Sequence, residues 1–256
     1  MSGAGHDGPG RLLGRRYRLL RTLGRGGMGE VHLAHQLNLG RLVVIKLVGP
    51  AQAALTNVRA LLDEARVAAR LHHPNVVSVL DVSGDGEPPF VVLEYLAGVS
   101  LREVIDRLAP EVVPTSIALT VAVDLLRGLH HAHGVRHPGG VGVVHRDVKP
   151  RNVMVTFAGV SKLIDFGISH WLGDDAPEPA MAGTRGYMAP EQYERAVVDG
   201  AADQYAVGVT LHELLTGVRP RGDDVTTADT PAAAARLEPR ADLDDELAGL
   251  IGRATA

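Results

Sequence analysis

The stretch that decides the fold is His145-Arg146-Asp147-Val148-Lys149-Pro150-Arg151-Asn152. It brings an imidazole, a guanidinium, a carboxylate, an ammonium and an amide into one short segment. Valines precede it at positions 141, 143 and 144 and follow it at 153 and 155, so two short strands should flank a polar loop. Pro150 lacks an amide donor and disfavours helix, which predicts a loop of fixed shape. A solvated turn without any function could carry the same residue types. A functional role for this loop therefore requires residues elsewhere in the chain that would act together with it.

Composition restricts the class of protein before any motif is considered. A chain of 256 residues, 45% hydrophobic and 22% charged, is typical of one large or two small globular domains. The net charge of −4 gives no case for nucleic-acid binding. The absence of cysteine excludes disulfides and thiolate metal sites. No stretch is long and apolar enough to span a membrane.

The N-terminal segment is glycine-rich and has no apolar core. We interpret residues 1–13 as a disordered leader rather than a signal peptide. A cytoplasmic location is the expectation for this chain, although the full-length protein could be anchored to a membrane by a segment beyond residue 256.

Three glycines, Gly24, Gly26 and Gly29, have the spacing G-x-G-x-x-G. In a dinucleotide-binding unit such glycines open a helix. Here Val31 and Leu33 alternate with polar residues, so the glycines should join two antiparallel strands. A glycine hairpin suits a flap whose backbone amides close over phosphates. A dinucleotide-dependent enzyme is therefore the weaker interpretation.

A third strand is predicted over residues 41–48, and Lys46 interrupts its apolar run. A lysine in such a strand either extends to solvent or needs a carboxylate partner. The helix predicted over 56–72 supplies one, because Glu64 lies near its middle. Strands are expected at 76–82 and 90–95, and we place a boundary after Leu96.

Helices dominate the predicted structure after this boundary. Ser100 and Glu103 form a capping-box pattern, and long helices are expected over 114–133 and 201–216. Gly134 and Gly217 follow these two long helices and are expected to end them. The apolar face of the first should comprise Ile117, Val121, Leu125 and Leu129. Its last turn carries His130, His131 and His133, which we attribute to the helix dipole rather than to a metal.

In combination, these motifs resemble the protein kinases, specifically the eukaryotic-like Ser/Thr kinases of bacteria. The motifs occur in the order of that family: the glycine loop, Lys46, Glu64, H-R-D-x-K-x-x-N at 145–152, Asp165-Phe166-Gly167 and Ala189-Pro190-Glu191. The resemblance implies an α+β, two-lobed protein-kinase-like fold. The kinase domain would span 14–256, with a small antiparallel β-sheet lobe containing one helix at 14–96 and a larger, mainly helical lobe at 97–256.

The resemblance also implies a site for ATP. The three glycines would cover the phosphates, and Lys46, paired with Glu64, would contact the α- and β-phosphates. Leu93 would guard the back of the adenine pocket. The pocket would be formed by Val31, Val44, Leu93, Met154 and the backbone of Glu94 and Leu96.

The same resemblance assigns the chemistry of phosphoryl transfer. Asp147 would accept the proton of the substrate hydroxyl, Lys149 would stabilise the γ-phosphate, and Thr184 would hydrogen-bond near Asp147. Asn152 and Asp165 would hold two Mg²⁺ ions, or Mn²⁺, which prefer oxygen ligands. Lys149 follows the Ser/Thr-kinase pattern, so the expected partners are ATP and proteins bearing Ser or Thr.

Two further roles follow from the same family pattern. Asp203 would brace the catalytic loop from the helix at 201–216, and Arg146 would read a phosphate on the activation segment. The rival interpretation is a pseudokinase that serves as a nucleotide-binding scaffold. The presence of Lys46, Asp147, Asn152 and Asp165 favours the enzyme.

Three features depart from the family pattern. Val44 stands where alanine is usual and should narrow the nucleotide pocket. The activation segment, 165–191, has Ser169 and Thr184 only at its ends, and acids (Asp174, Asp175 and Glu178) lie in its middle. These acids either replace a phosphate near Arg146 or form a solvated loop. Residues 221–240 have no clear periodicity, although a short helix is expected at 242–255, so the domain is expected to be truncated or reduced at its C-terminal end.

Overall fold

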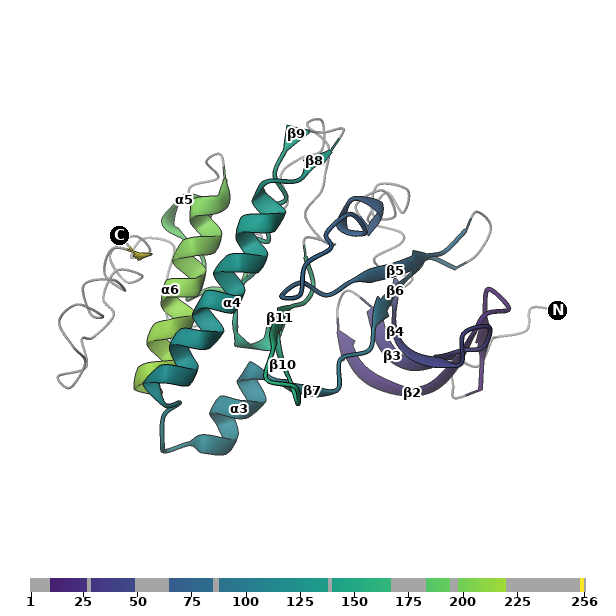
Figure 1. The fold of residues 1–256 in the computed structure, drawn as a ribbon, viewed down its shortest axis with the longest axis horizontal. Helices are drawn as coiled ribbons and strands as arrows, with labels where there is room; N and C mark the ends of the chain where they lie inside the picture. The colour runs from purple at the N-terminus through teal and green to yellow at the C-terminus, as the bar shows by residue number, and fades with distance from the viewer. Residues whose placement is uncertain are drawn as a thin grey trace. The chain divides into compact units, whose positions relative to one another are not determined.

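The computed structural model describes residues 10–26, 29–48, 65–84, 88–137, 140–166, 183–193, 198–219 and 254–255. They divide into two compact units (Figure 1). The first contains the described residues up to His72 together with Val77–Leu96, and the second contains His73–Val76 and the described residues that follow Leu96. Within these residues, no helix is both long and apolar enough to cross a bilayer.

The first unit is built on a six-stranded sheet with the order β1-β2-β3-β4-β6-β5, in which every neighbouring pair is antiparallel. This confirms the predicted antiparallel lobe. Its strands are β1 (Leu12–Leu13), β2 (Tyr17–Gly26), β3 (Gly29–Gln36), β4 (Arg41–Val48), β5 (Val79–Val82) and β6 (Phe90–Glu94).

One face of the sheet carries the core of this unit, because alternate residues of a strand point to the same side. The buried side chains on it include Tyr17, Leu19, Ala34, Val43, Ile45 and Phe90. The Tyr17 hydroxyl donates to Asp81 Oδ2 at 2.6 Å, which ties β2 to β5. Burial, followed by the hydrogen bond and charge of Asp81, raises the pKa of Tyr17 to about 12.

The boundaries of the first unit differ from the prediction in two places. Leu12 and Leu13, assigned to a disordered leader, form β1, and Leu13 is buried in the core. The strand expected at 76–82 begins at Val79, because Val76 belongs to the second unit and pairs there with Leu163. Of the helix predicted over 56–72, residues 65–68 are helical, and the part before them lies outside the described residues.

The second unit combines helices with short strands. Its helices are α3 (Leu101–Leu108), α4 (Thr115–His133), the 3₁₀ turn η1 (Pro150–Asn152), α5 (Pro190–Tyr193) and α6 (Gly200–Thr216). A three-stranded sheet has the order β11-β10-β7, formed by β7 (Gly98–Ser100), β10 (Val153–Thr156) and β11 (Ser161–Leu163). A hairpin of β8 (Arg136–His137) and β9 (Gly140–Val141) follows α4. The helices expected in the larger lobe are confirmed in these described residues.

Helix α6 packs beside α4 and is the buried centre of this unit (Figure 1). Every residue from Tyr205 to Leu215 is buried, as expected for a helix that is apolar on all sides. Asp199 caps its N-terminus, and Gly217 ends it with φ of 70°. Such a left-handed conformation favours glycine, so the predicted stop is confirmed with its physical cause.

The other helix boundaries follow the capping signals. The Ser100 hydroxyl accepts the Glu103 amide at 3.2 Å at the start of α3, and Gly134 follows α4. The predicted apolar face of α4 is wrong at one position. Ile117 is 53% exposed, because the buried stripe passes through Ala118 instead and continues to Val121, Leu125 and Leu129. The short helix expected at 242–255 lies almost wholly outside the described residues.

Candidate active site

The polar loop lies between β9 and β10 in the second unit. The flanking strands are shorter than predicted, since only Val141 of the preceding valines belongs to a strand. Residues 142–149 have no regular structure, and Pro150 begins η1. Proline suits this position because its fixed φ is compatible with a helical first turn, where no amide donor is needed.

Asp147 is the centre of a compact cluster of hydrogen bonds. Lys149 Nζ lies 2.7 Å from its Oδ2, and the Thr184 hydroxyl donates to its Oδ1 at 2.8 Å. Lys149 Nζ also donates to Thr184 Oγ1 at 2.5 Å. Thr184 is distant from Asp147 in sequence, so the fold brings together three residues that sequence analysis predicted to act as a group. The Asp147 carboxylate thus has a fixed orientation and a cation beside it.

Asn152 fixes the other side of the same carboxylate. Its amide nitrogen donates to both the backbone oxygen and Oδ2 of Asp147, each at 2.9 Å. The backbone carbonyl of Asn152 accepts the Ile164 amide at 2.9 Å, which places the following residue, Asp165, next to this loop. Because the amide nitrogen is used internally, the side-chain oxygen is the atom of Asn152 that suits a cation. A carboxylate and an amide oxygen match the preference of Mg²⁺.

Asp203 holds the backbone of the loop from α6. It is fully buried, and its carboxylate accepts the amides of His145 and Arg146, each at 2.8 Å. Arg146 has φ of 64°, a conformation that is costly for a residue other than glycine. The two amide bonds to Asp203 help to hold this conformation. The predicted bracing role of Asp203 is confirmed.

His133 has a contact that sequence analysis did not foresee. Its Nε2 lies 2.8 Å from Asp203 Oδ2, so its placement rests on this carboxylate and not only on the helix dipole. Gly200 permits the approach, because a Cβ there would lie 2.6 Å from His133 Nδ1. In the sequence, His133 stands in the last turn of a predicted helix. Cationic residues are common at that position because they interact favourably with the helix dipole, so nothing indicated a further contact with Asp203.

Two more residues support the site although their sequence context did not indicate it. Gln192 Nε2 donates to the Arg146 carbonyl at 2.9 Å, a further contact to the loop backbone. The Asn75 side chain donates to the Ser161 carbonyl at 2.9 Å, while its own carbonyl accepts the Leu163 amide. Asn75 therefore anchors β11, the strand that leads to Asp165. A single buried Asn or Gln side chain produces no repeating pattern in the sequence, so its role could not be predicted from residue spacing.

His145 connects the loop to the segment that contains Asp165. Its Nε2 donates to the Ile164 carbonyl at 3.0 Å, and its ring lies 4.6 Å from the ring of Phe166. Asp165 itself has φ of 60°. Strained backbone at both Arg146 and Asp165, flanked by buried hydrogen bonds, is typical of functional sites.

In the first unit, four predicted nucleotide-binding residues lie on one face of the sheet. Val31 is directly opposite Lys46, and Val44 is opposite Leu93. Directly paired residues on neighbouring strands point to the same face of a sheet, and so do residues two positions apart on one strand. Lys46 and Val44 are two positions apart on β4, so the side chains of Val31, Lys46, Val44 and Leu93 lie on one face. Gly26 pairs with Gly29, which confirms the glycine hairpin.

The remaining nucleotide-binding predictions have less support. The Glu94 amide already donates to the Ser78 carbonyl at 3.0 Å, so a backbone contact from Glu94 would have to use its carbonyl oxygen. Leu96 is half-buried in the first unit, and Met154 lies in β10 of the second. Glu64, the expected partner of Lys46, lies outside the described residues. Gly24 belongs to β2, opposite Val31.

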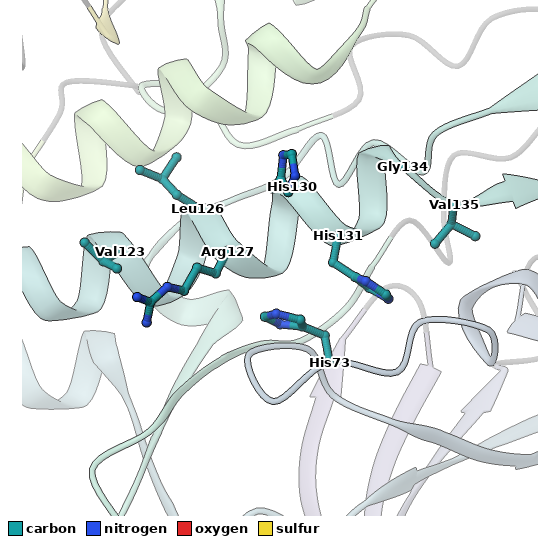
Figure 2. Close-up of a pocket in the computed structure, with 8 residues that line it drawn as sticks. All are labelled: His73, Val123, Leu126, Arg127, His130, His131, Gly134 and Val135. Carbon is teal, nitrogen blue, oxygen red and sulfur yellow. The ribbon is translucent and has the colours of Figure 1, made fainter.

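A pocket of about 670 Å³ lies elsewhere in the second unit, along α4 (Figure 2). His73 and His131 stack there with ring centroids 5.3 Å apart. Burial and the neighbouring His131 lower the pKa of His73. No predicted catalytic residue lines this pocket. Within the described residues no three His, Asp or Glu side chains form a metal-binding group.

Comparison with known proteins identifies the class to which this fold belongs. The family model described as protein kinase domain matches residues 17–244. The crystal structure of the PknI kinase domain of Mycobacterium tuberculosis superposes with a TM-score of 0.73 at 30% identity, covering 97% of this chain and 91% of that one. The α+β architecture is that of the two-lobed protein kinases.

Curated relatives narrow the comparison to bacteria. A probable serine/threonine-protein kinase of Streptomyces coelicolor is 39% identical over 90% of this chain and 34% of its own length. Serine/threonine-protein kinase PknB of Mycolicibacterium smegmatis is 36% identical over 90% of this chain and 36% of its own. Tyrosine-protein kinase MasK of Myxococcus xanthus is 37% identical over 94% and 40%. The chain belongs to the protein kinase domain family and resembles the kinase domains of bacterial serine/threonine kinases. It spans about a third of the length of these relatives.

Proposed function

We propose that this chain is the catalytic domain of an ATP-dependent kinase that phosphorylates serine or threonine in proteins. The observation that carries the proposal is the arrangement at Asp147, whose carboxylate is oriented by Lys149, Thr184 and Asn152. A scaffold that only bound nucleotide would have no need for this arrangement. Membership of the protein kinase family supports the use of ATP and a divalent cation.

In the proposed reaction, the substrate hydroxyl oxygen forms a bond to the γ-phosphorus of ATP while the bond to the β,γ-bridging oxygen breaks. The hydroxyl proton passes to Asp147. Because the transition state is loose, the main contribution of Asp147 is to orient the hydroxyl. Lys149, within 2.7 Å of that carboxylate, is placed to compensate negative charge on the transferred group.

The residues of the second unit also suit the divalent cation that the family uses. The side-chain nitrogen of Asn152 donates to Asp147, which leaves its side-chain oxygen as the atom that suits a cation, and the backbone of Asn152 accepts the amide of Ile164, the residue before Asp165. These two side chains would hold the metal, with Mg²⁺ preferred and Mn²⁺ as the alternative. When bound, the cation would neutralise charge on the phosphates.

The experiment that tests the proposal measures transfer of labelled phosphate from ATP to proteins or peptides with serine, threonine or tyrosine as the acceptor. Transfer to serine or threonine is expected, with loss of activity after chelation of the divalent cation. Because one relative is named a tyrosine kinase, transfer only to tyrosine would correct the acceptor class. Binding of ATP without any transfer would instead support a pseudokinase scaffold.

Replacement of Val44 by alanine is expected to tighten ATP binding by a few-fold. Val44 lies on the same face as Val31 and Lys46, where its extra methyl groups narrow the space for the adenine ring. Isothermal titration calorimetry measures the change. Val31→Ala is the matched control on the adjacent strand, and it should weaken binding because it only removes a contact. Equal affinity of Val44→Ala and wild type would contradict the predicted crowding.

Activity is expected without phosphorylation of the activation segment. Positions 170–183 contain no serine, threonine or tyrosine, and acids occupy 174, 175 and 178. Structurally, residues 167–182 lie outside the described part of the chain. We propose that these acids take the place of a phosphate beside the Arg146 guanidinium.

Phosphatase-treated and ATP-treated protein should therefore have the same specific activity, with phosphorylation mapped by mass spectrometry. The mass spectrometry should determine whether the hydroxyl groups of Ser169 and Thr184 carry phosphate. An activity that rises with phosphate on Ser169 or Thr184 would contradict the expectation.

A further inference from the structure

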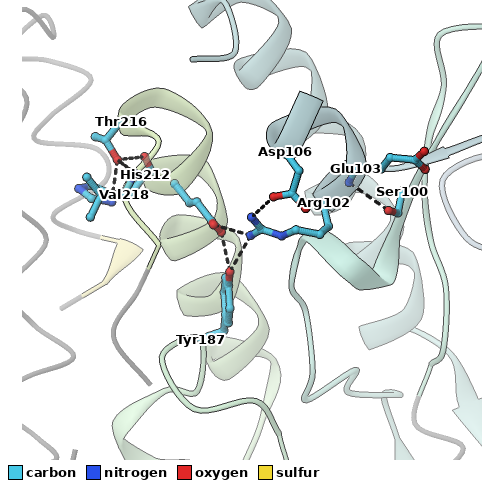
Figure 3. A network of polar contacts seen from close by, with 9 residues as sticks. Ser100, Arg102, Glu103, Asp106, Tyr187, His212, Thr216 and Val218 are labelled. Carbon is cyan, nitrogen blue, oxygen red and sulfur yellow. Dashed lines mark hydrogen bonds and ion pairs between the residues drawn. The ribbon is translucent and has the colours of Figure 1, made fainter. Parts of the chain in front are cut away.

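Buried polar side chains form hydrogen-bonded networks in both units. In the second unit, Arg102 of α3 and Glu213 of α6 form an ion pair, and the Tyr187 hydroxyl donates to Glu213 Oε2 at 2.5 Å (Figure 3). In the first unit, a separate network surrounds His32 of β3 and runs along the glycine hairpin. The chemistry described so far gives His32 no role, and its place beside the glycines indicates one.

His32 is enclosed by protein, and both of its ring nitrogens have partners. The residue is 2% exposed. Its Nε2 lies 2.9 Å from Glu30 Oε2, and its Nδ1 lies 3.4 Å from Thr22 Oγ1. A carboxylate accepts hydrogen bonds, so Nε2 carries a proton, and in the neutral ring Nδ1 accepts from the Thr22 hydroxyl. The ring therefore links Thr22 of β2 to the Glu30 side chain of β3.

Glu30 continues this network back to β2. Its Oε1 lies 3.0 Å from Nε of Arg25, the residue directly opposite it in the sheet. The Arg25 side chain is mostly exposed, so this ion pair alone would contribute little. Because His32 holds the same carboxylate from the buried side, Glu30 has a fixed orientation from which to bind Arg25. The network thus crosses between the two strands twice.

The two crossings flank an irregular part of the hairpin. Residues Thr22 and His32 are opposite each other, as are Arg25 and Glu30, and the register of the pairing shifts between Thr22 and Gly24. Such an irregularity interrupts the backbone ladder, and glycines add conformational freedom to the strands. Side-chain contacts on both sides of the shift restrict the hairpin to one arrangement.

The network lies behind the surface that would meet the nucleotide. Val31 belongs to that surface, and Glu30 and His32 are its two neighbours in β3. Successive residues of a strand point to opposite faces, so the Glu30 and His32 side chains lie on the other face. They can hold the glycine hairpin without occupying the space that phosphates would need.

We propose that His32 is a positioning residue that acts through Glu30 to hold the glycine hairpin over the phosphates of bound ATP. His32 itself would not touch the nucleotide. Its loss should therefore affect the contacts to the phosphates and spare those to the adenine. The inference rests on the proposed function, because it takes ATP as the ligand that the hairpin covers.

The test compares the affinities of magnesium–ATP and adenosine by isothermal titration calorimetry. His32→Leu fills the buried space but lacks both ring nitrogens. We expect its affinity for ATP to fall about 5- to 10-fold, as for the loss of one charge-assisted hydrogen bond. Its affinity for adenosine should change by less than about 2-fold, because adenosine has no phosphates. Equal losses for both ligands would show a general disturbance of the sheet and would refute the proposal.

Two further variants control this comparison. His32→Gln should restore ATP affinity to within about 2-fold of wild type, because the glutamine Nε2 can donate to Glu30 in place of the imidazole. His35→Leu is the matched control on the same strand. His35 is opposite Arg18 and Leu42, away from the glycines, so its replacement should leave ATP affinity unchanged. A loss in His32→Gln as large as that in His32→Leu would contradict the proposed link.

A double-mutant cycle tests the link itself. Glu30→Ala, His32→Leu and the double variant should lower ATP affinity by the same factor to within about 2-fold, because each breaks one connected path. Additive losses would mean that the two residues act separately. Glu30 lies partly at the surface, so Glu30→Ala also provides a test should His32→Leu not fold. Unchanged ATP affinity in Glu30→Ala would overturn the proposal.

Phosphate transfer separates this inference from the proposed function. In an active kinase, His32→Leu should raise the KM for ATP by about the same factor as it weakens binding, with a smaller change in kcat. A wild-type chain without transfer, together with selective loss of ATP affinity in His32→Leu, would overturn the proposed activity alone. An active wild type with unchanged ATP affinity and KM in the variants would overturn the inference alone.

Discussion

Replacing Asp147 by asparagine is expected to lower kcat by about 10²–10⁴-fold, the contribution usual for a positioned proton acceptor. The carboxylate has three side-chain contacts, with Lys149, Thr184 and Asn152. An asparagine has nearly the same shape but lacks the charge, and its amide nitrogen must face at least one donor of this cluster. The variant should therefore lose both the proton acceptor and the fixed orientation of the substrate hydroxyl.

The measurement is steady-state phosphate transfer at saturating ATP, together with the melting temperature. Asp199→Asn is the matched control. It makes the same change in charge at the N-cap of α6, where Asp199 Oδ1 accepts the Ala201 amide at 2.8 Å and asparagine is equally suitable. If Asp147→Asn retained wild-type kcat while Asp199→Asn did so too, the assignment of Asp147 as the proton acceptor would be wrong.

Removal of the Asp203 carboxylate should have the largest effect on stability, about 3–5 kcal/mol for Asp203→Ala. Asp203 is fully buried and satisfies the His145 and Arg146 amides and the His133 ring. Alanine would leave these donors without a partner and would release the strained backbone of Arg146. Activity should fall with it, because the loop that carries Asp147 would lose its support.

Thermal and denaturant unfolding measure this loss, which corresponds to roughly 2–4 °C for each kcal/mol in a chain of this size. Asp199→Ala is the control in the same helix. It removes an exposed cap and should cost about 1 kcal/mol. A destabilisation by Asp203→Ala no greater than that of Asp199→Ala would show that the three contacts of Asp203 are not structurally important.

The sequence was most informative where a feature is local. The hydrogen-bonding preferences of Ser100 and the backbone freedom of Gly217 predicted where α3 begins and α6 ends. Strand alternation after Gly29 distinguished a hairpin from a helix, and the structure confirms β3 there. The order of the kinase motifs then implied that Asp147, Lys149 and Thr184 act together, and the fold brings these three residues within hydrogen-bonding distance.

Prediction was weaker where burial or pairing depends on elements far apart in the chain. Val76 belongs to a strand-like run, yet it pairs with Leu163, and the predicted strand consequently starts at Val79. Ile117 has the residue type of a core position but is exposed, since the buried stripe of α4 passes through Ala118, one residue further along. Neither choice can be derived from the local pattern, because both satisfy the same periodicity.

By itself, the sequence determined the family, the antiparallel sheet around Gly24–Gly29, the ends of the long helices and the residues of the His145–Asn152 loop. These features depend on side-chain type and on spacing along the chain. Only the tertiary structure decided that Asp203 would bind the loop backbone together with His133, and that Arg102, Glu213 and Tyr187 would form one buried network. The physical reason is that a buried charge is stable only beside its partners, and those partners come from different helices that packing alone brings together.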